Sequence, residues 1–467
     1  MTIFIVFNLI LTIFTAVVLV GLYNKNNNHP VLKTQKLLIA SSYVISQVTT
    51  SWMIEKVMFI APNKPSLTYL ITIFLIFSFI SAIFINELKL VLKTFIQGVK
   101  NNYFFTIIII FTSIIIIFIS INLPVDSNDP LEYIQVAKNI SETGNFNHYP
   151  LINSELLKGY FPWSHPSGYV GMIVWSFNFT ENINDFMLLK LYNPLIAISF
   201  LIIFYIIFSG TNIYLRTILS FIGVLATPLL IIEVFHFHID PLRIFTFFIT
   251  GLLALELYKM KSIAQYILLG FLLGITLHSH SLGILIIPMF FGILAVDYYQ
   301  TKQFYVKPMC ISLFVTLIFV GFRYYINFNT LGYIVGDNTP LWKIESLNFS
   351  HYLQLTRGLE TPSNKILNGL LKVFTHIYSF GVTFWIYTLL FTKSFLTKKE
   401  KFLFNFSSYE TVSNFIILFW FLGSTTVTLM GSDILIKNDR YTLTIFPFVL
   451  ISTCMMLKRA ILKESEL

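Results

Sequence analysis

The feature of this sequence that most constrains its fold is a series of long, uninterrupted apolar runs. Three of them, at 103–122, 192–210 and 215–235, approach the roughly 20 residues that a helix needs to cross a bilayer. In lipid, a backbone satisfies its hydrogen bonds only as a helix or as a closed barrel, and barrel strands alternate apolar and polar residues. Because these runs do not alternate, the sequence predicts an all-α polytopic membrane protein.

The composition excludes a soluble domain. Hydrophobic residues make up 56% of the chain and charged residues 11%, whereas about a quarter of a soluble domain is charged. The formal net charge of +9 would otherwise favour a nucleic-acid partner. In a membrane protein, however, basic residues mark cytoplasmic loops, so we expect no nucleic acid. Cys310 and Cys454 both lie in apolar segments and predict neither a disulfide framework nor a zinc site.

Hydropathy along the chain predicts about thirteen transmembrane helices. They lie near residues 2–23, 37–60, 67–88, 103–122, 191–210, 215–235, 242–258, 264–278, 281–297, 309–326, 367–391, 412–431 and 441–457. The connecting loops alternate between a lysine-rich set and a set that holds most of the carboxylates. By the positive-inside rule, this places the N-terminus outside and the C-terminus in the cytoplasm. We expect the inner (plasma) membrane of a bacterium.

The first long non-cytoplasmic loop, 123–189, contains an acidic helix start. Loops longer than about 15 residues are unusual unless they have a function. Asp129 suits a helix N-cap, Pro130 suits the first helical position, and Glu132 would complete a capping box. Capping is compatible with catalysis, because a capping carboxylate can present its second oxygen to a substrate. A second amphipathic segment, 169–179, is apolar enough to lie in the membrane interface.

Together these segments resemble the first extracytoplasmic loop of the GT-C glycosyltransferases, of the protein mannosyltransferase and lipid A aminoarabinose transferase type. In that type the loop reads Asp-Glu-x-x-Tyr, followed by a Lys-Pro or His-Pro pair. Here the aspartate falls on Asp129, the tyrosine on Tyr133 and the basic residue on His165, before Pro166. Pro130 replaces the usual acid, and three additional helices precede the loop.

The resemblance implies a domain organisation and a reaction. It covers about 103–457, which leaves 1–102 as an N-terminal three-helix membrane extension and 458–467 as a cytoplasmic tail. It implies transfer of a sugar from a polyprenyl-phosphate donor to an extracytoplasmic lipid, glycan or protein acceptor. Asp129 would be the general base, and cations would stabilise the departing phosphate.

Cations and polar residues that could bind the substrates occur at predicted outer helix ends. Arg440 and Tyr441 open the last crossing, and an arginine fork suits phosphate better than lysine does. Taken alone, Arg243, Arg323 and Arg440 each also fit an interfacial arginine that extends to the membrane surface. The predicted substrate-binding residues are Glu132, Tyr133, His165, Arg243, His278, His280, Arg440 and Tyr441.

Several outer turns also hold potential metal ligands, namely His236, His238, Asp240, His278 and His280. They would form a divalent-metal site if the turns converge, although two histidines separated by one residue point in different directions on a helix. His278 and His280 could instead donate hydrogen bonds to a lipid phosphate. We predict no required cofactor and keep a divalent metal as an alternative.

Three other functions compete with sugar transfer. A secondary transporter would have charged or broken helices at the membrane midplane, where this sequence is nearly free of charge. A polysaccharide polymerase or ligase of the O-antigen type would use cations of a late loop, here 327–366, with Lys343, Arg357 and Lys365. A scaffold role would explain none of the loop features.

Overall fold

The computed structural model describes residues 2–25, 27, 30–125, 128–146, 166–180, 186–225, 227–260, 262–303, 305–331, 362–398, 409–429 and 439–464. Within these residues every regular element is a helix. The elements are α1 (Thr2–Asn24), α2 (Leu32–Ile60), α3 (Ser66–Ala82), η1 (Ile85–Glu87), α4 (Leu88–Asn101), α5 (Tyr103–Asn122), α6 (Asn128–Thr143), α7 (Gly168–Phe177), η3 (Leu189–Leu191), α8 (Tyr192–Ile207), α9 (Ile213–Leu225), α10 (Pro228–Phe235), α11 (Asp240–Lys259), α12 (Ile263–Ser279), η4 (Ser281–Leu285), α13 (Ile286–Thr301), α14 (Val306–Leu331), α16 (Pro362–Thr375), α17 (Ile377–Phe380), α18 (Thr383–Lys398), α20 (Tyr409–Leu429), α21 (Asp439–Thr442), η6 (Leu443–Ile445) and α22 (Phe446–Glu464).

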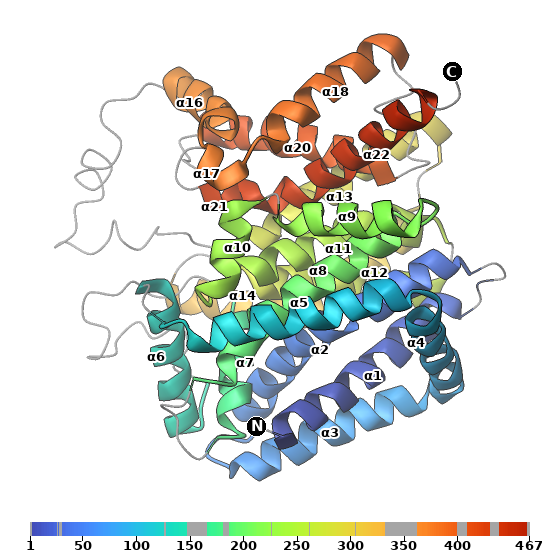
Figure 1. Cartoon of the computed structure of the whole chain (residues 1–467). Coiled ribbons are helices and arrows are strands. Elements are labelled where there is room, and N and C mark those ends of the chain that lie inside the picture. Colours follow the sequence, from blue (N-terminus) through green and yellow to red (C-terminus); the bar gives the residue numbers. More distant parts are fainter. Residues whose placement is uncertain are drawn as a thin grey trace.

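The long helices lie side by side in a bundle (Figure 1). In the described part of the chain, eight of them are long and apolar enough to cross a membrane, or up to ten if each of two bent pairs forms one span. This confirms the predicted class, an all-α protein with many membrane helices. The count of thirteen crossings stays a prediction.

Three predicted crossings are interrupted by bends. The segment predicted near 67–88 continues beyond a break into α4, and the two parts of that pair meet at 81°. The segment predicted near 215–235 divides into α9 and α10, and α10 begins at Pro228, which has no backbone N–H to continue a preceding helix. The segment predicted near 367–391 divides into α16, α17 and α18, with breaks at His376 and at Gly381, whose φ of +58° ends α17.

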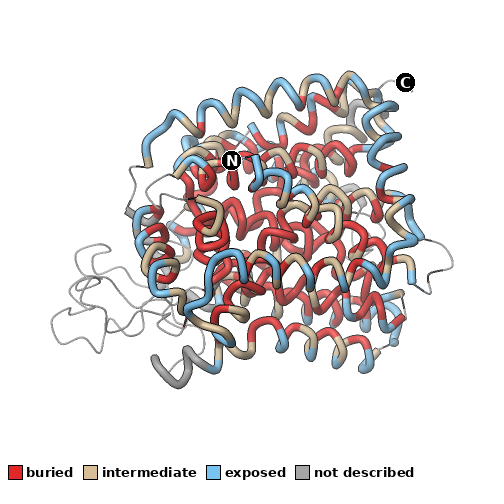
Figure 2. The backbone as a smooth tube through the Cα atoms, turned by 90° about the horizontal axis from the view of Figure 1, so that it is seen from below, coloured by how far each residue is buried: buried red, intermediate tan, exposed pale blue. Residues whose placement is uncertain are grey.

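The predicted N-terminal extension reaches the interior of the bundle through α2. In the most apolar 18-residue stretch of α2, 78% of the residues are buried. The corresponding share for α5 is 17%, so α5 faces the membrane and α2 faces protein. Helix α2 contacts α1, α7, α8, α11 and α12. Figure 2 shows the buried positions concentrated in the middle of the bundle.

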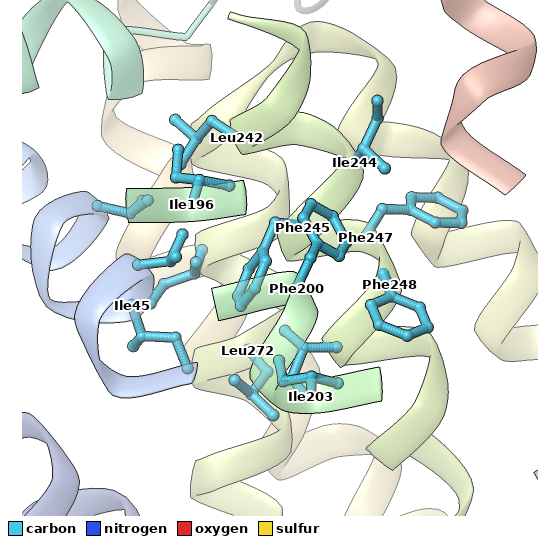
Figure 3. Packing of buried hydrophobic residues seen from close by; sticks show 14 of the residues in the cluster. Ile45, Ile196, Phe200, Ile203, Leu242, Ile244, Phe245, Phe247, Phe248 and Leu272 are labelled. Atoms are coloured by element: carbon cyan, nitrogen blue, oxygen red, sulfur yellow. The ribbon is translucent and has the colours of Figure 1, made fainter. Parts of the chain in front are cut away.

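Close packing of aromatic and small residues holds the helices together. Phe200 of α8 contacts Phe245 of α11 edge to face, with ring centroids 4.9 Å apart, and lies near Phe248 (Figure 3). Lipid tails are as apolar as side chains, so such shape complementarity, more than hydrophobicity, drives helix association in a membrane. Helices α12 and α14 pack closely at Gly270, where an added Cβ would overlap the carbonyl oxygen of Ser312.

We therefore expect Gly270→Leu to destabilise the protein, because its side chain has no space between α12 and α14. Overpacking of this kind typically costs about 1–3 kcal/mol. The matched control is Gly321→Leu on α14, where no atom lies within 4 Å of the added Cβ. Thermal unfolding of the purified variants in detergent measures the difference, and equal melting temperatures for the two variants would contradict the packing.

Candidate functional site

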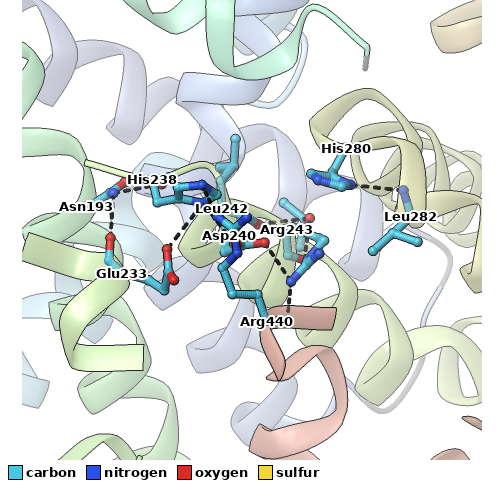
Figure 4. Close-up of polar contacts among 10 residues, drawn as sticks. Asn193, Glu233, His238, Asp240, Leu242, Arg243, His280, Leu282 and Arg440 are labelled. Atoms are coloured by element: carbon cyan, nitrogen blue, oxygen red, sulfur yellow. Dashed lines mark hydrogen bonds and ion pairs between the residues drawn. The ribbon is translucent and has the colours of Figure 1, made fainter. Parts of the chain in front are cut away.

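A cluster of buried charges lies at the end of the bundle that carries α6, α10 and α21, at the left of Figure 1. We call this the α6 end, and the sequence predicts that it faces outside. Asp240 opens α11 ahead of Pro241, a favourable pair for a helix start because an acid there faces the positive end of the helix dipole. Its Oδ1 forms an ion pair with Arg243 Nη2 at 2.6 Å. Its Oδ2 lies 2.8 Å from His238 Nδ1, and all three side chains are buried (Figure 4).

Arg440 connects α21 to this cluster. Its Nη1 donates to Nε2 of His238, and its Nε lies 3.7 Å from Asp240 Oδ2. Nδ1 of His238 faces the Asp240 carboxylate and also accepts from the Asp240 backbone N–H at 3.4 Å. The backbone carbonyl of Arg440 accepts from Arg243 Nη2 at 2.5 Å. Arg243 therefore joins the first turn of α11 to α21.

Glu233, in the last turn of α10, completes a group that could bind a metal ion. One carboxylate oxygen of Glu233 lies 3.2 Å from His238 Nδ1, and candidate ligand atoms of Glu233, His238 and Asp240 lie within 4.8 Å of one another. A divalent cation, however, would have to compete with Arg440 for His238 and would add positive charge beside two guanidinium groups. Asp240 is already paired with Arg243, so a cation would gain little there, whereas an anionic ligand could use the guanidinium donors that the carboxylates leave unengaged.

Arg243 has donors available for such an anion. Its side chain is fully buried, and neither Nε nor Nη1 has a hydrogen-bond partner among the described residues. A buried donor without a partner costs about 1–3 kcal/mol, more when it is charged. A guanidinium group is the side chain best suited to phosphate or carboxylate oxygens. Tyr441 lies beside it, with the Arg243 Cζ 5.6 Å from the centroid of the Tyr441 ring.

His278, at the end of α12, is a second buried group without a partner. Its side chain is 1% exposed, and both of its ring nitrogens lack hydrogen-bond partners in the described structure. Thr246, three residues after Arg243, forms a 2.8 Å hydroxyl hydrogen bond with Ser279 of α12, the neighbour of His278. His280 has a local role, because its Nδ1 accepts the Leu282 N–H at the start of η4.

Two tyrosines place α6 over the cluster. The Tyr133 ring lies edge to face on Tyr169, and the ring centroids of Tyr133 and His238 are 6.2 Å apart. Tyr169 donates to the carbonyl of Phe237, a residue held at a φ of +53° in the turn between α10 and α11. Burial raises the pKa of Tyr169 well above its usual value, so its hydroxyl keeps the proton that it donates.

The predicted base lies on this same helix. Asp129 is in the first turn of α6, four residues before Tyr133, and residues at that spacing share a helix face. The side chains of Asp129 and Glu132 lie outside what the structure describes, as does the whole of His165. Of the other predicted substrate-binding residues, Tyr133, Arg243, Arg440 and Tyr441 belong to one cluster, and His278 and His280 lie at the neighbouring end of α12.

Sequence reasoning missed a second buried cluster around Glu55 of α2. Glu55 accepts from Arg323 Nη2 at 2.5 Å and from Nε at 3.0 Å, and Ser167 donates to its other oxygen. Arg323 is 1% exposed, so it does not extend to the membrane surface as a snorkelling arginine would. The available signal was Glu55 itself, the only acid in the crossing predicted near 37–60, since a lone intramembrane acid usually has a buried partner.

We expect Glu55→Gln to destabilise the protein strongly, because it leaves the Arg323 charge buried without a counterion. Breaking such a pair typically costs about 3–5 kcal/mol, whereas replacing both partners by apolar residues is often neutral. The double variant Glu55→Met with Arg323→Met should therefore recover stability. Glu87→Gln, at a half-buried carboxylate that accepts from Asn24, is the control and should change little. Chemical unfolding of the four proteins tests this, and a double variant less stable than Glu55→Gln would contradict it.

Comparisons with known proteins do not place the chain in a family. No family model matches the sequence, and no curated protein and no solved structure matches the chain. The chemistry of the α6 end, with its buried arginine donors, is therefore what bears on function.

Proposed function

We propose that this chain transfers a sugar from a polyprenyl-phosphate donor to an acceptor outside the cytoplasm, as the GT-C glycosyltransferases that its first loop resembles do. The observation that carries the proposal is Arg243, whose buried guanidinium has unpartnered donors next to Arg440. Both arginines lie at the end of the bundle to which α6 brings Asp129. A lipid-borne donor and an acceptor from the aqueous side could both reach this end.

The two arginines suit the departing phosphate. Asp240 and the Arg440 carbonyl engage only Nη2 of Arg243, so the donors on its other two nitrogens remain for phosphate oxygens. Transfer breaks the bond between the sugar C1 and the phosphate oxygen, and negative charge builds up on that oxygen. Fixed donors in a site of low dielectric stabilise such charge far more than water does, because they need no reorganisation.

Asp129 suits the other half of the reaction. The bond that forms joins the acceptor oxygen to the sugar C1, and the acceptor hydroxyl loses its proton to a base. Asp129 shares a helix face with Tyr133, whose ring lies next to His238 of the arginine cluster. The predicted base and the phosphate-binding donors would thus act on the two sides of one sugar.

One observation favours a transporter as a second candidate. Glu55 and Arg323 form an ion pair inside the bundle, and intramembrane charges often mark transport pathways. The Glu55 carboxylate, however, already accepts hydrogen bonds from Arg323, Lys56 and Ser167, which leaves it little capacity for cargo. The polymerase or ligase alternative depends on Lys343, Arg357 and Lys365. Lys343 and Arg357 lie outside the described residues, and so does the side chain of Lys365.

The proposal is tested by deleting the gene in its host and restoring it as wild type, Asp129→Asn or Arg243→Gln. Surface glycolipids and polysaccharides are then compared by mass spectrometry. Deletion should remove a sugar that wild type restores. Both variants should restore far less of it, since loss of one donor to a developing oxyanion costs roughly 100- to 1,000-fold in rate and loss of a general base roughly 100- to 10,000-fold.

The matched control is Arg216→Gln. Arg216 lies on α9 at the opposite end of the bundle, where its Nε donates to the Tyr205 carbonyl, and its loss should leave the glycan intact. All variants must be present at equal levels in the membrane. Full restoration by Arg243→Gln would refute the phosphate site. A deletion that changes no glycan would refute sugar transfer and favour transport.

A further inference from the structure

Helix α4 crosses the end of the bundle opposite α6, the end that the sequence predicts to be cytoplasmic (Figure 1). It meets α3 at 81°, so its axis runs across the direction of the membrane-crossing helices and along the membrane surface. Contacts with α1 fix the bend between α3 and α4. The Phe84 ring packs so closely on Gly21 that a Cβ added there would overlap it, and Asn24 Nδ2 donates to Glu87 Oε2 at 3.0 Å.

The exposed apolar side chains of α4 lie on one face. They fall within a sector of about 100°, since a helix turns once in 3.6 residues. They are Leu92, Phe95, Ile96 and Val99. Phe95 and Ile96 are 63% and 62% exposed, whereas Val91, on the side that packs on the bundle, is buried. An apolar face on a helix that lies along a membrane surface enters the boundary between headgroups and acyl chains.

A row of lysines borders this apolar face. Lys89, Lys93 and Lys100 lie within about 40° of one another around the helix, next to Ile96 and opposite Val91. All three are exposed, and none has a hydrogen-bond or ion-pair partner in the part of the chain that the structure describes. Helix α4 itself contains no acidic residue. It therefore presents three unpaired positive charges beside an apolar surface.

We propose that α4 binds anionic phospholipids, whose phosphates pair with Lys89, Lys93 and Lys100 while the apolar face lies among their acyl chains. A lipid leaflet holds a layer of phosphates directly above hydrocarbon, and α4 presents its lysines and its apolar face in the same order. Lysine stems are long enough to reach the headgroups from a helix at this depth. Without an acid on α4 the lysines favour lipids of net negative charge, because a zwitterionic headgroup also carries a cation that they repel.

The experiment uses the purified chain in phosphatidylcholine nanodiscs that contain a small share of a photoreactive lipid. This lipid is either a phosphatidylglycerol or a phosphatidylcholine, with a diazirine at the same position of one acyl chain. After irradiation, labelled peptides are quantified by mass spectrometry. The ratio of phosphatidylglycerol to phosphatidylcholine labelling on α4 is compared with the ratio near Phe118, an exposed residue at the far end of α5.

In wild type, the ratio on α4 should exceed the ratio near Phe118 at least about tenfold, since each lysine near an anionic surface contributes roughly fivefold. Lys89→Gln with Lys93→Gln should lower the ratio on α4 at least about fivefold, whereas Lys89→Arg with Lys93→Arg should keep it. The matched control, Lys302→Gln with Lys307→Gln, removes the same charge from exposed lysines at the predicted cytoplasmic end and should also keep it. All melting temperatures should stay equal, because the lysines of α4 have no partner among the described residues.

Equal labelling of α4 by the two lipids in wild type would overturn the inference, because it would show a lipid contact without a choice of headgroup. Weak labelling of α4 by both lipids would also overturn it, since a protein or a second copy of the chain would then cover the apolar face. A high ratio that survives Lys89→Gln with Lys93→Gln would place the anionic lipid on other residues and overturn it as well. None of these measurements involves sugar transfer, so this inference and the proposed function can fail separately.

Discussion

The buried negative charge of Asp240 is the constraint on which the α6 end depends. A carboxylate in the interior of a membrane bundle is stable only when cations and donors surround it, because isolated burial costs far more than a protein's net stability. Arg243, His238 and Arg440 surround it, and they come from α11, the turn before α11 and α21. One charge thereby fixes three segments, including one that lies 200 residues further along the chain.

Helix α7 links this cluster to the second one. Ser167, just before α7, donates to Glu55, while Tyr169 in its first turn donates to the Phe237 carbonyl beside His238. Gly168 between them packs so closely on the His278 carbonyl that a Cβ would overlap it. The start of α7 is therefore held by hydrogen bonds to Glu55 and to the Phe237 carbonyl, and Gly168 between them leaves no space for a larger side chain. This rigidity suits a segment that directly follows the His-Pro pair of the first long loop.

The sequence predicted the fold class well because apolar runs and charge alternation are local properties. The bends were missed, although Pro228 and Gly381 stand where two predicted crossings divide. The long-range pairings were not predictable, because the sequence gives no sign of contact between residues so far apart. Glu55 and Arg323 are 268 residues apart, and only packing shows that they form a pair. The candidate site was found in part, as Arg243 and Arg440 were named without Glu233 as a partner.

The balance of charges also bears on how tightly this site can hold an anion. Asp240 and Glu233 offset the two arginines, so Arg243 offers a ligand free hydrogen-bond donors more than it offers net positive charge. A large positive excess would also retain the product, since the departing phosphate carries more negative charge than the phosphodiester donor does. Donors that are fixed in direction by Asp240 and by the Arg440 carbonyl instead stabilise the charge as it develops on the phosphate oxygen. In the proposed transfer this charge develops in the transition state, whereas a carrier breaks no bond and gains nothing from such donors. Paired charges with directed donors are therefore what the proposed transfer requires of this cluster.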